Sequence, residues 1–162
     1  AVGMRQRMEQ LGNGDSPDAR HICLGDVVST QIETQGGVLI SLTHDTSLPR
    51  PRSLDFEVQG TRGLWDGVNR RIYIEGSSER ETWEDDAPYI SRYDSLYWQR
   101  WGREAIEQDS HHKGMDYIML RAIEDDMQGG IAYPATLDDL ALWTSVSVLS
   151  EQSIKEHRRI EL

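Results

Sequence analysis

The order of its periodic segments is the feature that most constrains this chain. Apolar residues recur at every second position in four segments, residues 28–34, 38–42, 54–58 and 72–74. Beyond residue 88 the spacing becomes helical, over residues 95–108, 114–128 and 136–156. Strands followed by helices predict an α+β fold, an open and mostly antiparallel sheet with helices packed on one face.

The other sheet face is predicted to be polar and available for oligomer or domain contact. A Gly36–Gly37 turn should join the first two strands. The final residues, 157–162, could add a closing edge strand. Six short side chains are expected on the polar face, Ser29, Gln31, Glu33, Ser41, Thr43 and Asp45.

The predicted helices carry the expected core. Trp and Met residues at helical spacing are interpreted as core, and Trp143 is assigned a structural role. Thr136 and Asp139 have the spacing of a capping box. The stripe expected to be buried on the second helix is Met115, Ile118, Met119, Ala122, Ile123 and Met127.

The domain organisation follows from the change of pattern near residue 25. Residues 1–24 are interpreted as an N-terminal helix and connector, and residues 25–162 as one α+β domain. The single cysteine, Cys23, excludes an internal disulfide and is interpreted as a small buried residue.

Charge and hydropathy exclude several classes of function. The net charge of −11 argues against nucleic-acid binding, which needs a basic surface. No apolar run approaches the roughly 20 residues of a membrane span, so no membrane association is predicted. Glu84, Asp85 and Asp86 could hold a metal ion, although a solvated acidic loop is the preferred interpretation.

One polar concentration lies in THDTSLPRPRS, residues 43–53. It contains His44, Asp45, Arg50 and Arg52, and its two prolines fix φ and stiffen the segment. A rigid loop with two guanidinium groups suits hydroxyl, carboxylate or phosphate recognition. The alternative is that both arginines pair with surface carboxylates.

The second concentration is SHHKGMDYIML, residues 110–120, at a predicted helix start. A helix N-terminus presents free backbone N–H groups to a ligand. His112 could then exchange a proton there, while Gly114 would permit a close approach of the ligand to the backbone. The alternative is an ordinary helix start with exposed histidines, in which Asp116 only stabilises the helix.

Six blocks in order resemble one family. They are GDVVSTQIETQGG, SLTHDTSLPRPRS, VQGTRGLW, SLYWQRWG, SHHKGMDYIMLRAIEDD and LDDLALWTSVSVLSEQSI. Over residues 25–162 the chain resembles the C-terminal domain of glycoside hydrolase family 109. These α-N-acetylgalactosaminidase-like proteins belong to the glucose–fructose oxidoreductase and inositol dehydrogenase superfamily.

The resemblance implies that this chain is part of a larger enzyme. Family members have an N-terminal Rossmann domain that binds NAD, so no NAD is expected on this chain. Their chemistry implies oxidation of the sugar at C3, elimination of the aglycone, addition of water and re-reduction, without the acid pair of ordinary glycosidases. The implied partners are that Rossmann domain, a carbohydrate substrate and further copies of the chain, joined through the open sheet face.

The resemblance also bears on single residues. The family run HGGMD corresponds to residues 112–116, and the loop PRPYS to residues 49–53. Lys113 replaces a usual glycine and Arg52 a usual aromatic, so a sugar other than N-acetylgalactosamine, an acidic one included, becomes an alternative substrate. No catalytic residue is assigned here. The predicted substrate-binding residues are His112, Arg52, Arg50, Asp116, Lys113 and His44.

Two alternatives to a role as part of a glycosidase stay open. One is a sugar oxidoreductase of the same superfamily, and the other is an assembly or binding module that retains the fold without catalysis. Relatives commonly carry an export signal, so the resemblance implies a periplasmic or secreted location, which this sequence by itself does not specify.

Overall fold

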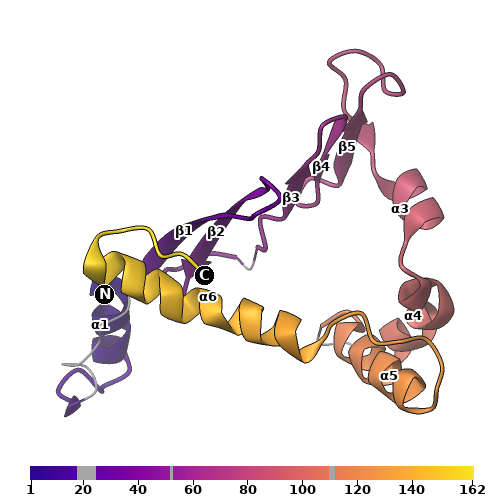
Figure 1. Ribbon diagram of the computed structural model, residues 1–162. Coiled ribbons are helices and arrows are strands. Elements are labelled where there is room, and N and C mark those ends of the chain that lie inside the picture. The colour runs from indigo at the N-terminus through magenta and orange to yellow at the C-terminus, as the bar shows by residue number, and fades with distance from the viewer. Residues whose placement is uncertain (18–24, 52, 110–111) are drawn as a thin grey trace. The chain divides into compact units, whose positions relative to one another are not determined.

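The computed structural model describes residues 1–17, 25–51, 53–109 and 112–162, and it confirms the α+β class (Figure 1). The predicted boundary after residue 24, Cys23 and Arg52 lie outside the described residues. The chain divides into two compact units, Ala1–Arg52 with Leu149–Leu162, and Ser53–Val148. Among the described residues no helix is long and apolar enough to span a membrane.

The first unit is built around an antiparallel hairpin. Strand β1 (Val27–Glu33) pairs with β2 (Leu39–Asp45) along its whole length. The Gly37 amide donates to the Thr34 carbonyl at 2.9 Å and Gly37 has φ +79°, which confirms the predicted glycine turn. Helix α1 (Val2–Gln10) and the end of helix α6 (Leu137–Glu156) complete this unit.

The two faces of this hairpin have the predicted composition. Directly opposed residues share a face, so Thr30 and Leu42 lie on the apolar side, where a 2.9 Å hydrogen bond joins the hydroxyls of Thr30 and Ser150 of α6. On the polar side the Ser41 hydroxyl donates to the Gln31 amide oxygen at 2.8 Å. The alternation therefore predicted correctly that these residues lie on opposite faces.

The second unit contains a separate four-stranded antiparallel sheet rather than a continuation of the first. Its strands, in spatial order, are β3 (Glu57–Gln59), β4 (Gly63–Asp66), β5 (Arg71–Ile74) and β6 (Glu84–Asp85). The strand predicted over residues 54–58 is wrong in extent, because Asp55 has φ +43° and its amide donates to the Ser53 hydroxyl at 3.2 Å. A left-handed residue interrupts an extended backbone.

The three predicted helices are confirmed to within one residue at each end. They are α4 (Leu96–Gln108), α5 (Met115–Met127) and α6, and the short helix α3 (Ala87–Tyr93) was not predicted. The Ser95 hydroxyl caps α4 by accepting from the Trp98 amide at 3.3 Å.

The capping box at the start of α6 is also confirmed. The Asp139 amide donates to the Thr136 hydroxyl at 3.1 Å, and the Thr136 amide donates to the Asp139 carboxylate at 2.8 Å. The hydrogen bond from the Thr136 amide, together with one from its hydroxyl, lowers the pKa of Asp139.

The apolar core of the second unit is the contact between α4 and α5, which lie side by side (Figure 1). Its buried side chains are Trp101, Ala105, Ile118 and Ala122. The prediction that the whole apolar stripe is buried is wrong, since Met127 is 84% exposed. Small residues bring the two helices together along a narrow line, and the flanking apolar side chains stay in solvent. Trp143 of α6 is likewise 59% exposed rather than core.

The closing edge strand predicted at residues 157–162 is wrong. These residues form no strand, and α6 ends where His157 adopts φ +51°. The Arg158 amide donates back to the Ser153 carbonyl at 3.3 Å. A left-handed residue with such a back-bond is a common helix terminus.

Candidate functional site

The start of helix α5 is shaped by two consecutive left-handed residues. Lys113 has φ +55° and Gly114, the N-cap, has φ +86°, while the Met115 amide donates to the His112 carbonyl at 3.2 Å. A non-glycine residue in this region is uncommon. Glycine adopts this conformation without strain, whereas Lys113 carries a side chain, which is exposed.

Gly114 serves helix packing rather than ligand approach, so the expected ligand-access role is wrong. It is buried, and a Cβ added there would lie 2.8 Å from the Cβ and from the carbonyl carbon of Ala105 in α4. The space beside its backbone is therefore occupied by the neighbouring helix. The glycine fixes the distance between α4 and α5.

His112 and Asp116 form a pair at this helix start. The Nδ1 of His112 lies 2.7 Å from Oδ2 of Asp116, one turn further along the chain, and the side chains are 49% and 56% exposed. A carboxylate that accepts from Nδ1–H fixes the ring orientation and leaves Nε2 as an acceptor. Asp116 thus orients an imidazole ring that is about half exposed.

A carboxylate from a different region anchors the segment that follows β2. Asp26 accepts hydrogen bonds from the Gly3 amide at 2.9 Å, the Met4 amide at 3.0 Å and the Ser47 hydroxyl at 3.0 Å. The hydrogen bond from Gly3, supported by those from Met4 and Ser47, lowers the pKa of Asp26 to about 2. Sequence reasoning missed Asp26, because its partners are distant in the chain.

The candidate residues of this segment do not form one cluster. The Arg50 guanidinium lies 3.8 Å from the Asp45 carboxylate, as expected if the arginine pairs with a nearby acid. His44 precedes Asp45 in β2 and is opposite Val28, so it lies on the apolar face while Asp45 lies on the polar face. Because strand alternation separates them, His44 and the Arg50–Asp45 pair face different sides of the hairpin.

The predicted site residues thus fall into two groups. His44 and Arg50 belong to the first unit, whereas His112, Lys113 and Asp116 belong to the second. The closest association among them is the His112–Asp116 pair. Substrate binding by either group stays a prediction.

The acidic run at residues 84–86 has a structural role and is not simply solvated. Asp86 is fully buried, accepts from the Trp65 indole at 2.8 Å and lies 2.9 Å from the Arg70 guanidinium. Glu84 accepts from the Tyr89 hydroxyl at 2.8 Å. In residues 1–17, 25–51, 53–109 and 112–162 no three His, Cys, Asp or Glu side chains are grouped to hold a metal.

The described residues do not fit a dinucleotide. Pyrophosphate binding of the Rossmann type needs a parallel strand–helix unit with a glycine-rich turn. Every strand pair here is antiparallel, and the sequence has no glycine fingerprint. The described residues therefore form no Rossmann-type site for NAD.

Comparison with known proteins points to one family. A family model described as "Glycosyl hydrolase 109, C-terminal domain" matches residues 1–161. An "Alpha-N-acetylgalactosaminidase" of Tannerella forsythia is 37% identical over 153 residues, covering 94% of this chain and 32% of that protein. A "Glycosyl hydrolase family 109 protein" of Parabacteroides distasonis gives the same identity and coverage.

A further relative extends the comparison to another genus. A "Glycosyl hydrolase family 109 protein" of Stenotrophomonas maltophilia is 40% identical over 131 residues, 81% of this chain and 28% of that protein. The chain spans about a third of the length of these curated relatives.

Proposed function

We propose that this chain, which belongs to the glycosyl hydrolase 109 C-terminal domain family, forms the substrate-facing part of an NAD-dependent glycosidase. The T. forsythia relative is named for hydrolysis of α-N-acetylgalactosaminides, and this chain matches it over 94% of its length. The substrate class proposed for the complete protein is accordingly a glycoside. The reaction proposed for it is oxidation–elimination at the sugar, for which NAD supplies the hydride acceptor.

One observation supports a substrate-binding role more than any other, the His112–Asp116 pair. The ring is exposed, its Nδ1 is held at 2.7 Å by Asp116, and its Nε2 makes no hydrogen bond among the described residues. A preoriented imidazole of this kind can donate to or accept from a sugar hydroxyl. Lys113 precedes the helix with an exposed side chain and could reach the same ligand.

In the complete enzyme, cofactor binding and substrate binding are proposed to belong to two different domains. The described residues form no Rossmann-type site, so NAD is proposed to bind an N-terminal Rossmann domain. The curated relatives have room for such a domain, because about two-thirds of their length lies outside the match. The residues of this chain then bind and orient the sugar. Arg50 and Arg52 are proposed as further substrate-binding residues.

The polar face of the β1–β2 hairpin is proposed as the surface for subunit association. It presents hydroxyl and amide groups, such as the Ser41–Gln31 pair, which can exchange hydrogen bonds with another copy.

The alternative of a sugar oxidoreductase or a non-catalytic module is favoured by one feature, Lys113 in a left-handed position where the family usually has glycine.

The test uses the full-length protein that contains this chain. Release of nitrophenol from p-nitrophenyl α-N-acetylgalactosaminide and related glycosides is measured with and without NAD. We expect His112→Ala to lower kcat/KM about ten- to a hundredfold, the effect of losing a hydrogen bond to substrate, with little change in Tm because the ring is exposed.

Two further variants sharpen this test. Asp116→Asn should lower kcat/KM less than His112→Ala, because the amide oxygen can still accept from Nδ1–H. Asp138→Asn is the matched control, since Asp138 is also an acidic residue in the first turn of a helix. Turnover that is independent of NAD, or a large loss of Tm with normal turnover in His112→Ala, would contradict the proposal.

A further inference from the structure

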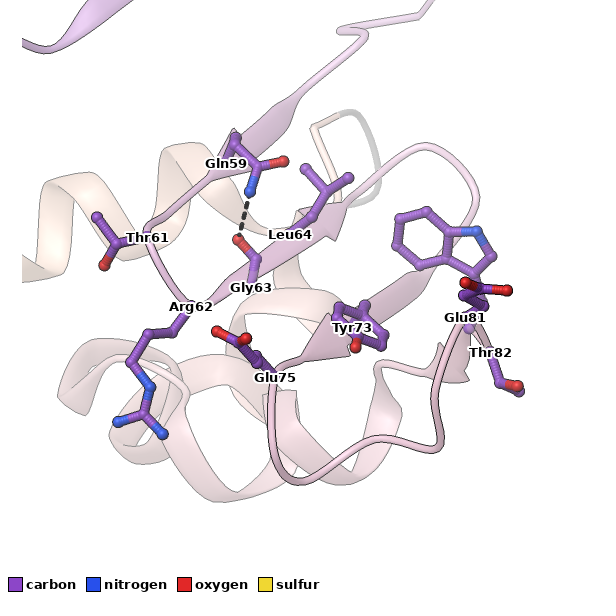
Figure 2. Close-up of a pocket in the computed structure, with 10 residues that line it drawn as sticks. Gln59, Thr61, Arg62, Gly63, Leu64, Tyr73, Glu75, Glu81 and Thr82 are labelled. Carbon is purple, nitrogen blue, oxygen red and sulfur yellow. Dashed lines mark hydrogen bonds between the residues drawn. The ribbon is translucent and has the colours of Figure 1, made fainter.

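A hollow of about 490 Å³ lies on the four-stranded sheet, and its lining residues include none of the predicted substrate-binding residues (Figure 2). Its volume is within the range of roughly 300–1,000 Å³ that small-molecule sites occupy. It is lined by Gln59, Thr61, Arg62, Gly63, Leu64, Tyr73, Glu75, Glu81, Thr82 and Trp83.

The strand register explains why these side chains meet. Gln59 is opposite Leu64, and Leu64 is opposite Tyr73, so the three form a row across β3, β4 and β5 on one face. On the other face the Trp65 indole donates to Asp86, the N-cap of helix α3. The hollow therefore occupies the sheet face that does not carry these contacts.

Two aromatic rings provide its apolar surface. Tyr73 is half-buried, and Trp83 is 41% exposed. The Arg71 guanidinium lies 4.4 Å from the centre of the Trp83 ring and is itself held by Asp66 at 2.9 Å. A cation over one ring face restrains the indole, as a recognition surface requires.

Polar groups surround these rings. The Gln59 amide donates to the carbonyls of Gly60 and Gly63 at 2.9 and 3.1 Å, which fixes the amide and leaves its oxygen able to accept. Arg62 and Glu75 are brought together by the 2.9 Å bond from the Glu75 amide to the Arg62 carbonyl. Their side chains make no hydrogen bond or ion pair within the described part of the chain. In Figure 2 Tyr73 lies between Glu75 on one side and Glu81 on the other.

We propose that this hollow binds a neutral sugar residue. The rings offer a surface for the C–H face of a pyranose, and the amide, guanidinium and carboxylate groups supply donors and acceptors for its hydroxyls. Two carboxylates, Glu75 and Glu81, outnumber the single guanidinium of Arg62, so an anionic ligand is disfavoured. This inference does not depend on the proposed role of His112.

The test is a titration of the 162-residue chain, without NAD, followed by ¹H–¹⁵N NMR. The probes are methyl β-galactopyranoside and methyl α-glucopyranoside, with glucuronate as the anionic comparison. We expect saturable shifts of the Trp83 indole resonance and of the amides of residues 61–64 and 73–75 with at least one neutral glycoside. Trp83→Ala should weaken that binding about tenfold or more, the usual cost of removing an aromatic anchor.

Matched variants separate loss of binding from loss of folding. Trp143→Ala removes another exposed tryptophan that does not line the hollow, and it should leave the affinity unchanged. If Trp83→Ala does not fold, the exposed substitutions Gln59→Ala and Glu75→Gln serve instead, and each should weaken binding severalfold.

Four results would overturn the proposal. The first is that neither neutral glycoside causes saturable shifts, and the second is that folded variants of the hollow bind the glycoside as tightly as the parent chain. The third is that glucuronate binds more tightly than the neutral glycosides, and the fourth is that the shifts depend on the protein concentration rather than on the sugar concentration. The last would assign the face to a second copy of the chain. Because this assay contains no NAD and no hydrolysed bond, its failure is distinct from failure of the proposed glycosidase function.

Discussion

Gly114 lies so close to Ala105 that a Cβ on the glycine would be 2.8 Å from the alanine Cβ. This contact joins the start of α5 to α4 and places the turn that carries His112. We predict that Gly114→Ala lowers the free energy of unfolding by about 2–4 kcal/mol, because it adds a clash with backbone to the strain of φ +86°. Urea unfolding of the chain measures this loss.

Gly129 provides the control for that prediction. It has φ +80°, but nothing lies within 4 Å of the position its Cβ would take. Gly129→Ala should therefore cost about 1 kcal/mol, from the left-handed conformation only. Equal losses in the two variants would show that the contact with Ala105 does not stabilise the helix pair.

Replacing Lys113 with glycine should make the folded chain more stable. Its φ of +55° costs an L-residue more than the extra chain entropy of glycine, so Lys113→Gly is expected to raise the free energy of unfolding by about 0.5–1 kcal/mol. Arg70 is the contrasting position, with φ +57° but an ion pair to the buried Asp86. Arg70→Gly should destabilise the chain, and thermal unfolding of both variants would reveal a wrong sign in either.

Two carboxylates should make the chain sensitive to acid. Hydrogen bonds from Gly3 to Asp26, and from Asn69 to Asp66, hold the pKa of each aspartate at about 2. An unfolded aspartate has a pKa near 4, so between pH 4 and 2 the unfolded chain binds more protons. The stability these groups contribute is present above about pH 4 and is lost as the pH falls toward 2.

Urea midpoints measured between pH 2 and pH 6 test this expectation. Asp26→Asn should flatten the acid limb of the profile, whereas Asp15→Asn, an exposed carboxylate, should leave it unchanged. A profile that is the same for Asp26→Asn and the parent chain would remove Asp26 as a source of the pH dependence.

The capping box of α6 gives the fourth prediction. Thr136→Ala removes the hydroxyl that accepts from the Asp139 amide, and it should cost about 1 kcal/mol. Thr144 lies within the same helix and donates to the Leu140 carbonyl, an interaction that does not favour the helix. Thr144→Ala should be neutral or slightly stabilising, and a larger loss there than at Thr136 would contradict the capping role.

Local signals predicted most of this fold. The helices α4, α5 and α6 were predictable because long periodic segments carry their own start signals, such as Ser95 and Thr136. Strands β4 and β6, which span four and two residues, were not predicted. Their pairing depends on neighbouring strands, which a pattern within one segment does not contain.

The candidate site was predictable only in its local part. His112 and Asp116 are only four residues apart, so their contact forms locally, between the turn before α5 and the first turn of that helix. The burial of Asp86 was not predictable, because its indole partner, Trp65, lies 21 residues earlier in the chain. The hollow beside Tyr73 and Trp83 was missed for the same reason, since it exists only once β3, β4 and β5 have paired.

The Arg71 guanidinium contacts two side chains, the carboxylate of Asp66 and the ring of Trp83. Protonation of Asp66 would release the guanidinium and with it one restraint on the indole. The mobility of a single tryptophan thereby becomes coupled to the charge of an aspartate on strand β4. Acidic buffers should broaden the Trp83 indole resonance before the chain unfolds as a whole.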